Sequence, residues 1–269
     1  MKRIYLLGPN GMLGQMVNRY FSARSGWEVV ALSVRFDMGN LMNYFRRFDH
    51  EAPGVFVNGI GGIPQKLRAP QDFVLPNVLL PLELARSLSS HHLLVHPSTD
   101  CVFRGDMGHA YASTHVPDAT DPYGWTKLQA ERILLTRPRT WVVRTSIIGP
   151  SVGQTCGLLA WFLAQPRHAA LTGFTNQLWN GLTTLQWCKE LETLLSQAPN
   201  EQARLIQMGT AESYSKFDML QLFRDRFRTD VSVAARPHAD AVDRRLQPDH
   251  LVKPLQEQLD ELAAELPRS

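Results

Sequence analysis

The chain has 269 residues, of which 44% are hydrophobic and 20% are charged. A chain of this length and composition can bury a substantial core, which excludes a disordered protein and leaves room for one large domain or two unequal ones. The formal net charge of +3 is too weak to indicate nucleic-acid binding, although it suits an anionic small molecule.

Cysteine usage and hydropathy indicate the compartment. Cys101, Cys156 and Cys188 are widely spaced and form no Cys-x-x-Cys motif, which favours free thiols in a reducing environment. The apolar run Ile4–Leu7 is too short for a secretory signal peptide, and no run approaches the length of a membrane span. We therefore expect a cytoplasmic protein that does not contact a membrane.

A glycine motif follows the first predicted strand. Ile4–Leu7 runs directly into Gly8-Pro-Asn-Gly11-Met-Leu-Gly14, and a helical stretch comes next. Glycines between a strand and a helix let the backbone approach a pyrophosphate at the helix N-terminus. A glycine triplet alone is often only a turn, but its place directly after the first strand favours a dinucleotide site.

The tip of the second predicted strand bears on the choice of cofactor. Strand Glu28–Leu32 ends at Ser33 and Arg35, with no acidic residue before Asp37. At this tip an acid would bind a ribose 2′-hydroxyl and an arginine would accommodate a 2′-phosphate. The sequence therefore favours NADPH over NADH, with Arg35 as an exposed loop charge as the alternative.

Small residues end the third predicted strand. Val55–Val57 runs into Asn58-Gly59-Ile60-Gly61-Gly62, which leaves room for a ligand at the carboxyl end of a parallel strand. A helix rich in leucine follows Pro76-Asn77 and ends near His91-His92. We interpret this histidine pair as positive charge or polarity near a helix C-terminus. No carboxylate or cysteine cluster completes a metal site, so no metal is predicted.

Hydroxyl groups follow the fourth predicted strand. Leu93–His96 leads into Ser98-Thr99-Asp100-Cys101-Val102-Phe103, where Thr99 is placed to hydrogen-bond a substrate oxygen beside a nicotinamide. The alternative is a hydroxyl that only satisfies nearby backbone. The Gly-, Ser-, Pro- and Asp-rich segment 104–120 is typical of a loop over a site.

A tyrosine and a lysine then stand four residues apart at the start of a predicted helix, in Tyr123-Gly-Trp-Thr-Lys127. Residues i and i+4 share a helix face, so the phenol and the ammonium can point into one cleft. A nearby cation lowers the pKa of a tyrosine, which then serves as an acid or a base. Alone, the pattern also fits two surface residues.

The second half of the chain predicts a smaller region. Its expected elements are strands and helices at 141–145, 158–163, 182–195, 205–209, 215–227 and 255–266. We expect an α/β fold: a Rossmann-type, doubly wound parallel sheet over 1–150, interleaved with a smaller, mainly helical substrate-binding region over 151–269. Arg236, Arg244 and Arg245 suit a diphosphate or are solvated charges.

Four of these motifs, in this order, resemble the extended short-chain dehydrogenases/reductases, and most closely the dTDP-4-dehydrorhamnose reductase group. They are the glycine motif at 8–14, Ser-Thr-Asp-x-Val-Phe at 98–103, Tyr-Gly-x-Thr-Lys at 123–127, and Arg-Thr-Ser at 144–146. The resemblance is strong over roughly 1–150 and weaker beyond, where the segment from Asn176 to Thr184 is similar to the family's substrate side.

The resemblance implies roles for individual residues. Tyr123 matches the proton donor, Lys127 the residue that binds nicotinamide ribose and lowers the tyrosine pKa, and Thr99 the hydroxyl that orients the substrate carbonyl. The cofactor NADP, with NAD as the alternative, would contact Gly8, Asn10, Gly11, Met12, Leu13, Ser33, Arg35, Asp37, Met38, Asn58, Gly59, Ile60, Gly61 and Ser98 in addition to Tyr123 and Lys127. The substrate would contact Thr99, Asp100, Val102, Phe103, Gln177 and Trp179.

The implied function is reduction of a nucleotide-linked 4-keto sugar in deoxysugar or surface-polysaccharide biosynthesis, and the expected partner is that small molecule, with a homodimer left open. Ser33, Ser113 and Ile147 depart from residues common in the group, which leaves the sugar undefined. Cys101 stands where related 4,6-dehydratases carry a glutamate, which argues against dehydration. The alternatives are a nucleotide-sugar epimerase and a non-catalytic NAD(P)-binding regulatory subunit.

Overall fold

The structure, a computed structural model, describes residues 1–67, 69–151, 157–197 and 201–265. Cys156 lies outside these residues, and the other two cysteines are free thiols. No helix in the described ranges is both long and apolar enough to cross a membrane.

A parallel sheet of seven strands forms the centre of the described chain, in the order β14-β10-β5-β4-β3-β1-β2. All neighbours in it pair in parallel. Its strands are β1 (Lys2–Leu7), β2 (Trp27–Leu32), β3 (Val55–Asn58), β4 (Leu93–Pro97), β5 (Thr140–Arg144), β10 (Arg204–Thr210) and β14 (His250–Val252).

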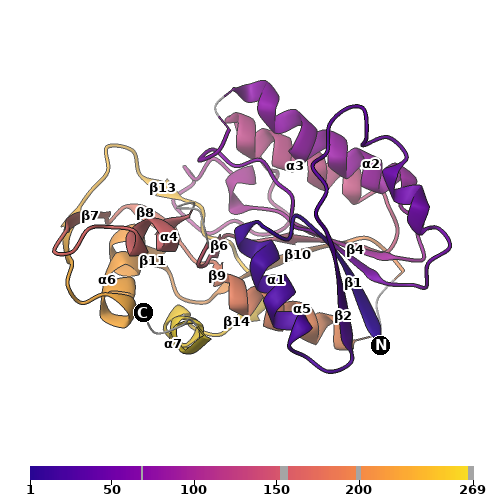
Figure 1. Cartoon of the computed structure of the whole chain (residues 1–269). Helices are drawn as coiled ribbons and strands as arrows, with labels where there is room; N and C mark the ends of the chain where they lie inside the picture. The colour runs from indigo at the N-terminus through magenta and orange to yellow at the C-terminus, as the bar shows by residue number, and fades with distance from the viewer. Residues whose placement is uncertain (68, 152–156, 198–200, 266–269) are drawn as a thin grey trace.

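The sheet is buried on both faces, because successive residues of a strand point to opposite sides. In β1, Ile4 and Leu6 belong to one core cluster, whereas Tyr5 and Leu7 belong to another. On the first face lie α1 (Met12–Ser22) and α5 (Thr184–Ser196), and on the second lie α2 (Leu80–Ser87) and α3 (Pro122–Leu134) (Figure 1). The result is the doubly wound three-layer α/β fold that the sequence predicted.

The order of the strands fixes where a ligand can bind. β1 lies between β2 and β3, so the chain leaves β1 toward one edge of the sheet and later continues toward the other. In open α/β sheets, ligands bind outside the carboxyl ends of the strands at such a reversal. The carboxyl ends of β1 and β3 carry Gly8 and Asn58, which brings the predicted glycine loop to this position.

Short helices complete the second face. They are the 3₁₀ helices η1 (Tyr44–Phe48), η2 (Pro70–Phe73) and η4 (Asp100–Val102), and the π-helical turn η3 (Leu75–Leu79), which leads directly into α2. Aromatic residues of η1 pack against Tyr5 and Phe56, whose rings stack with centroids 4.5 Å apart. No element was predicted for the segment of η1.

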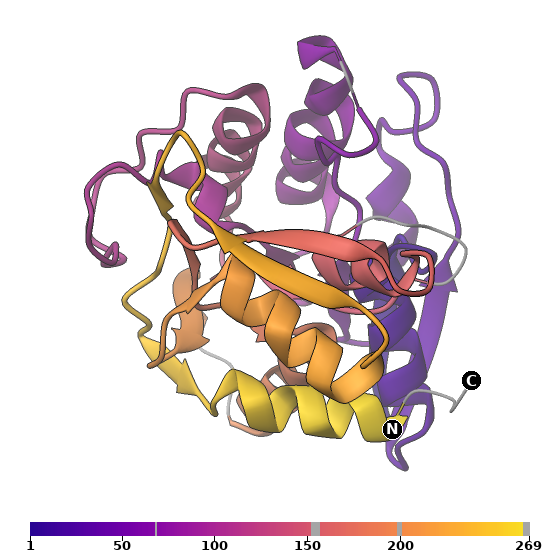
Figure 2. The same ribbon diagram turned by 90° about the vertical axis from the view of Figure 1, so that its left-hand side faces the viewer.

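Residues after 150 form a smaller lobe and also return to the central sheet. The lobe contains α4 (Leu158–Leu163), α6 (Lys216–Phe227) and α7 (Leu255–Glu265), which lie together at the side of the sheet seen in Figure 2. Its strands pair as β7 (Ala170–Phe174) with β12 (Ser232–Arg236), and β8 (Gln177–Trp179) with β11 (Tyr214–Ser215) and β13 (Val242–Asp243). Its strand β9 (Leu182–Thr183) pairs with β6 (Ile147–Ile148), which precedes residue 150. Because β10 and β14 belong to the central sheet, the two parts share one core.

The helix expected at 158–163 has these bounds in the structure, and most other predicted elements differ by one or two residues.

The interpretation of His92 as positive charge at a helix end was wrong. This ring is fully buried, where Nδ1 accepts a hydrogen bond from Gly54 N (3.1 Å) and Nε2 lies 3.0 Å from the Phe48 carbonyl oxygen. Burial lowers its pKa, so it serves as a neutral link between loops rather than as positive charge at a helix end.

Candidate active site

The glycine loop after β1 has the geometry of an anion-binding turn. Gly8 has φ of +68°, and a Cβ atom on Gly14 would lie 2.1 Å from the Gly8 carbonyl oxygen, so the loop packs on α1 through backbone. Gly11 caps α1 without a side-chain hydrogen bond, and the first turn holds no acidic residue. Unoccupied N–H groups and a positive helix end suit a pyrophosphate, which these residues therefore fit. Leu13 is buried, so only its backbone faces the loop.

The tip of β2 exposes the residues that were predicted to meet the adenosine end of a cofactor. Ser33, Arg35 and Asp37 are exposed, and 65% of Met38 is exposed. Asp37 Oδ1 accepts hydrogen bonds from the backbone N–H groups of Gly39 (2.8 Å) and of the next residue (3.0 Å). The nearest acid is thus used to shape its own turn.

At the end of β3, the predicted cofactor segment divides into buried and accessible residues. Asn58 is 2% exposed and its side-chain amide bonds His96 in the neighbouring strand. Gly59 and Ile60 are half-buried and Gly61 is exposed. The side chain of Asn58 therefore lies beneath the loop, and the residues after it form the edge of the crevice.

Thr99 lies two residues after the end of β4 and is the N-cap of η4. Its Oγ1 accepts a hydrogen bond from Cys101 N (3.1 Å) and donates one to Asp100 Oδ1 (3.1 Å). Val102 and Phe103, which were predicted to contact substrate, are both fully buried. They form a core cluster below the loop, where Phe103 stacks on Tyr111 with ring centroids 4.2 Å apart.

Close backbone packing brings α3 to Thr99. Asp121 caps the helix by accepting a hydrogen bond from Gly124 N (2.9 Å), and Pro122 occupies its first turn. A Cβ atom on Gly124 would lie 2.1 Å from the Cys101 carbonyl oxygen. Only glycine lets the first turn of α3 approach so closely, and this contact sets Tyr123 beside Thr99.

The charges at this junction differ from the expectation. Lys127 is buried, with its Nζ donating to the Pro97 carbonyl oxygen (2.6 Å), and burial lowers its pKa to about 8. The pKa of Tyr123 is raised, chiefly by burial, while a side-chain hydrogen bond with Thr99 acts in the opposite direction. The predicted lowering of the tyrosine pKa by the lysine is therefore absent from this structure, because desolvation outweighs the hydrogen bond.

Ser98, which was predicted to contact the cofactor, bonds the elements below the site. Its buried hydroxyl donates to Glu131 Oε1 (2.5 Å), and Glu131 is bonded by Arg144 through Nε (3.1 Å) and Nη2 (2.6 Å). Arg144 Nη1 also donates to Gln207 Oε1 (3.1 Å) in β10. The Arg-Thr-Ser motif thus supplies an arginine that joins α3 to the sheet below the site.

On the substrate side, the structure separates the predicted residues. Asp100 stays next to Thr99, whereas Trp179 is buried at the end of β8 and Gln177 donates to the Asp240 carbonyl oxygen (2.7 Å). Arg244 does reach the site, with Nη1 3.7 Å from Cys101 Sγ.

The rest of the expected basic patch does not form with it. Arg245 pairs with Asp243 and Arg236 is exposed on β12. No sequence signal distinguishes Arg244 from its neighbour Arg245.

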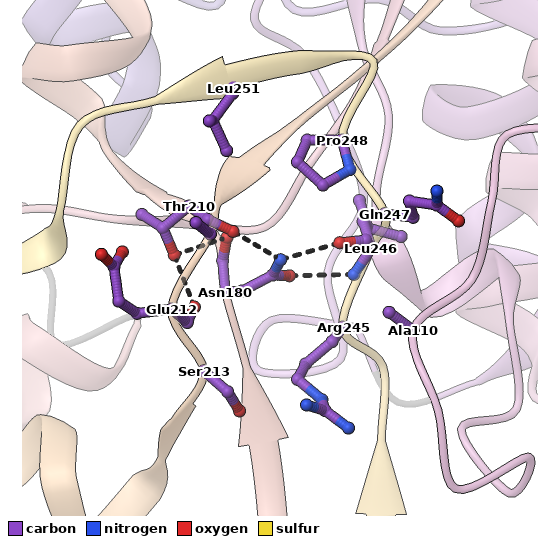
Figure 3. Close-up of a pocket in the computed structure, with 11 residues that line it drawn as sticks. Ala110, Asn180, Thr210, Glu212, Ser213, Arg245, Leu246, Gln247, Pro248 and Leu251 are labelled. Carbon is purple, nitrogen blue, oxygen red and sulfur yellow. Dashed lines mark hydrogen bonds between the residues drawn. The ribbon is translucent and has the colours of Figure 1, made fainter.

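A pocket of about 410 Å³ opens elsewhere, between the end of β10 and residues 245–248 (Figure 3). Asn180 holds its wall together: Nδ2 donates to the carbonyl oxygens of Thr210 (3.0 Å) and Leu246 (2.8 Å), and Oδ1 accepts from Leu246 N (2.9 Å). None of the predicted catalytic residues lines it. In the described part of the chain, no group of three or more histidine, cysteine or acidic residues is placed to hold a metal ion.

Two curated relatives match part of the chain. The dTDP-4-dehydrorhamnose reductase of Aggregatibacter actinomycetemcomitans is 29% identical over 151 residues, 54% of this chain and 51% of the relative. A probable dTDP-4,6-dihydroxy-2-methyloxan-3-one 4-ketoreductase of Streptomyces antibioticus is 31% identical over 159 residues, 57% of this chain and 54% of the relative. The chain thus spans about half the length of the curated relatives it matches.

Similarity in fold extends over the whole chain. The crystal structure of dTDP-4-dehydrorhamnose reductase from Bacillus anthracis in complex with NADP superimposes with a TM-score of 0.81 at 17% identity, covering 99% of this chain and 100% of that one. At this identity the match establishes the fold. The family model described as RmlD substrate binding domain matches residues 1–266. The resemblance indicated by the four motifs is therefore confirmed, and the chain belongs to the RmlD substrate binding domain family.

Proposed function

We propose that this protein uses NADPH to reduce the keto group of a nucleotide-linked 4-keto sugar, with Tyr123 as the proton donor. The observation that carries the proposal is the meeting of Thr99, Tyr123 and Lys127 at the carboxyl edge of the sheet, the same edge that bears the glycine loop. Dinucleotide and reacting carbonyl would then share one crevice.

The chemistry assigns a task to each of the three residues. A bound nicotinamide supplies the hydride, and the carbonyl oxygen gains negative charge as the hydride arrives. A tyrosine with a raised pKa stays protonated at neutral pH, which is the form a proton donor needs. Thr99 orients the same oxygen through its hydroxyl, and Lys127, in its charged form, stabilises the phenolate left after proton transfer.

The cofactor proposal rests on both ends of the crevice. The loop from Gly8 to Leu13 would hold the pyrophosphate through its backbone, and Gly59 to Gly61 would lie along the nicotinamide half. At the adenosine end, Arg35 is exposed and Asp37 is occupied in its own turn, which favours a 2′-phosphate over a free 2′-hydroxyl. The relative from Bacillus anthracis was crystallised with NADP, which supports the same cofactor here.

We place the reaction in the cytoplasm, in deoxysugar or surface-polysaccharide biosynthesis, and the free thiols of Cys101 and Cys188 suit a reducing compartment. The curated relatives match only about half of the chain, so its activity, substrate and location are all part of this proposal.

The test is a panel of dTDP-, GDP- and UDP-linked 4-keto sugars with NADPH and purified protein. We expect turnover with one NADPH consumed per product, and Tyr123→Phe to lower the rate by about 10²–10⁴-fold while NADPH affinity stays within about twofold. Tyr214→Phe, which removes a hydroxyl that bonds Gln256 in the other lobe, is the matched control and should keep its rate.

Failure would be clear. No turnover with any member of the panel, or a Tyr123→Phe enzyme as active as the control, would overturn the proposal. Turnover without net NADPH consumption would identify an epimerase instead.

A further inference from the structure

Three buried polar side chains behind the candidate active site form a continuous hydrogen-bonded chain across three elements. Asn58 ends β3, His96 lies in β4 and Lys127 lies in α3, and they are 2%, 1% and 5% exposed. Asn58 Nδ2 lies 3.1 Å from His96 Nδ1, and His96 Nε2 lies 3.1 Å from Lys127 Nζ. Buried polar groups need partners of the right kind, so the direction of each bond is constrained by the next.

The direction is set at the Asn58 end. The backbone N–H of Ile60 can only donate, and it lies 3.2 Å from Asn58 Oδ1. This bond turns the amide nitrogen of Asn58, which also only donates, toward His96 Nδ1. Nδ1 must then be the acceptor, so a neutral His96 carries its proton on Nε2.

That proton points at Lys127. An ammonium group has three donors and no acceptor, so it cannot receive the Nε2–H bond, whereas a neutral amine can accept it and still donate to the Pro97 carbonyl oxygen at 2.6 Å. The arrangement in the structure therefore matches an uncharged Lys127. Charging Lys127 moves the imidazole proton to Nδ1, which in turn requires the Asn58 amide to turn over and release Ile60 N–H.

We infer that Asn58 and His96 set the protonation state of Lys127, which makes His96 a positioning residue for the active site. The catalytic meaning of this inference rests on the proposed function, but the coupling itself does not. One proton is taken up when the lysine becomes charged, and His96 is neutral both before and after, changing only its tautomer. Because Ile60 belongs to the loop proposed to line the cofactor, the charge on Lys127 is linked to the conformation of that loop.

The charged and titratable groups near Lys127 do not override its coupling to His96. On α3 itself, Glu131 favours the ammonium, but Arg144 is ion-paired to Glu131. Tyr123 lies one turn before Lys127 on the same helix. Burial lowers the pKa of Lys127 to about 8 and, together with the lysine charge, holds the pKa of His96 well below its ordinary value. These shifts agree with a neutral imidazole beside a lysine that titrates near neutrality.

The first experiment measures the tautomer of His96 directly and needs neither an activity assay nor a substrate. In protein labelled with ¹⁵N-histidine, long-range ¹H–¹⁵N spectra distinguish the two ring nitrogens of each of the nine histidines, and His96→Gln assigns the signals of His96. We expect His96 protonated on Nε2 above about pH 8 and on Nδ1 below it, without gaining charge. One fixed tautomer from pH 6 to pH 10, or an imidazolium in that range, would overturn the inference.

The second experiment reverses the bond direction with a nearly isosteric change. Asn58→Asp keeps an acceptor for Ile60 N–H but presents an acceptor to His96 Nδ1, so the ring proton stays on Nδ1 and Nε2 accepts from an ammonium. We expect the pKa of Lys127, followed by NMR of ¹³C-labelled lysine, to rise by about one unit or more. In a cofactor-saturated assay, the alkaline limb of the rate profile should move up by the same amount.

The matched control is Asn77→Asp, which places the same charge in another buried site, bonded to Thr126 Oγ1 (3.1 Å) next to Lys127 in the chain but not to His96. It should raise the lysine pKa clearly less than Asn58→Asp does. Equal shifts in the two variants would mean that a nearby charge is enough, and the inference would fail. If the NMR shifts appear but no substrate of the panel turns over, the coupling stands and only the proposed function fails.

Discussion

Two charged side chains near the tip of β2 differ in what remains available for a ligand. Oδ1 of Asp37 accepts hydrogen bonds from two backbone N–H groups, whereas the guanidinium of Arg35 is exposed and has no partner among the described residues. One carboxylate oxygen of Asp37 is thus engaged in its own turn, while a 2′-phosphate would find a free cation in Arg35.

Arg35→Ala should therefore weaken NADPH binding by about tenfold and leave NADH binding within about twofold, because only the 2′-phosphate contact is lost. Fluorescence titration with each dinucleotide measures both affinities. Arg132→Ala, which removes an exposed arginine from α3, is the control. An NADPH preference that survives Arg35→Ala unaltered would remove the role assigned to Arg35.

At the same scale, the structure brings the predicted residues Thr99 and Tyr123 together but turns several of their neighbours inward. Thr99, Tyr123 and Lys127 stand in motifs in which the hydroxyl, phenol and amine groups themselves indicate the chemistry. Ser98, Val102 and Phe103 belong to one of the same motifs, but a pattern of letters does not say which side chains turn inward. His96 interrupts an apolar strand with a polar ring, a signal that indicates a buried contact without naming its partner.

Among the elements, α3 carries both the chemistry and the main polar contact with the sheet. One side of its length bears Tyr123 and Lys127, and one turn further Glu131 pairs with Arg144 of β5, with side chains 2% and 3% exposed. Breaking such a pair leaves an uncompensated buried charge, which costs far more than the loss of an exposed pair. The position of the proposed catalytic residues thus depends on a buried ion pair below them.

Glu131→Gln should lower the free energy of unfolding by about 3 kcal/mol, since Arg144 stays charged and buried. Urea denaturation at pH 7 measures the change. Glu265→Gln removes the partner of Arg19 in a pair whose side chains are 50% and 52% exposed, and it should cost less than about 1 kcal/mol. Similar losses in the two variants would show that burial adds nothing to this pair.

Elements with their own sequence signal were predicted well, and those defined by distant partners were not. Helices such as α4 and α6 show apolar spacing that is local in the chain. β7 and β12 pair with one another across roughly sixty residues. None of the five residues of β12 is buried and four of them are exposed, so no alternating pattern marks the strand. The segment of η1 is shaped by aromatic packing against the sheet, which spacing alone cannot indicate.

For the molecule as a whole, the sequence motifs and the core packing give opposite answers to whether residues 1–150 form an independent domain. The sequence motifs for the cofactor end near residue 146, which suggests a separate dinucleotide domain. Yet most members of the core cluster on the α1 face come from residues after 150, including Trp187, Phe223 and Leu259, and β10 covers the edge of β5. A fragment of residues 1–150 would expose that face of the sheet to water.

We therefore expect residues 1–150 alone to lack a cooperative unfolding transition and to expose apolar surface, whereas the whole chain unfolds in one transition. Urea melts followed by circular dichroism, with binding of a hydrophobic dye before denaturation, compare the two. Within the whole chain, hydrogen exchange should give the amides of β3 and of α5 the same free energy of opening, because both depend on one core. A sharp transition and NADPH binding by the fragment would instead establish the first part as an independent domain, with the second lobe added to a sheet that is already stable.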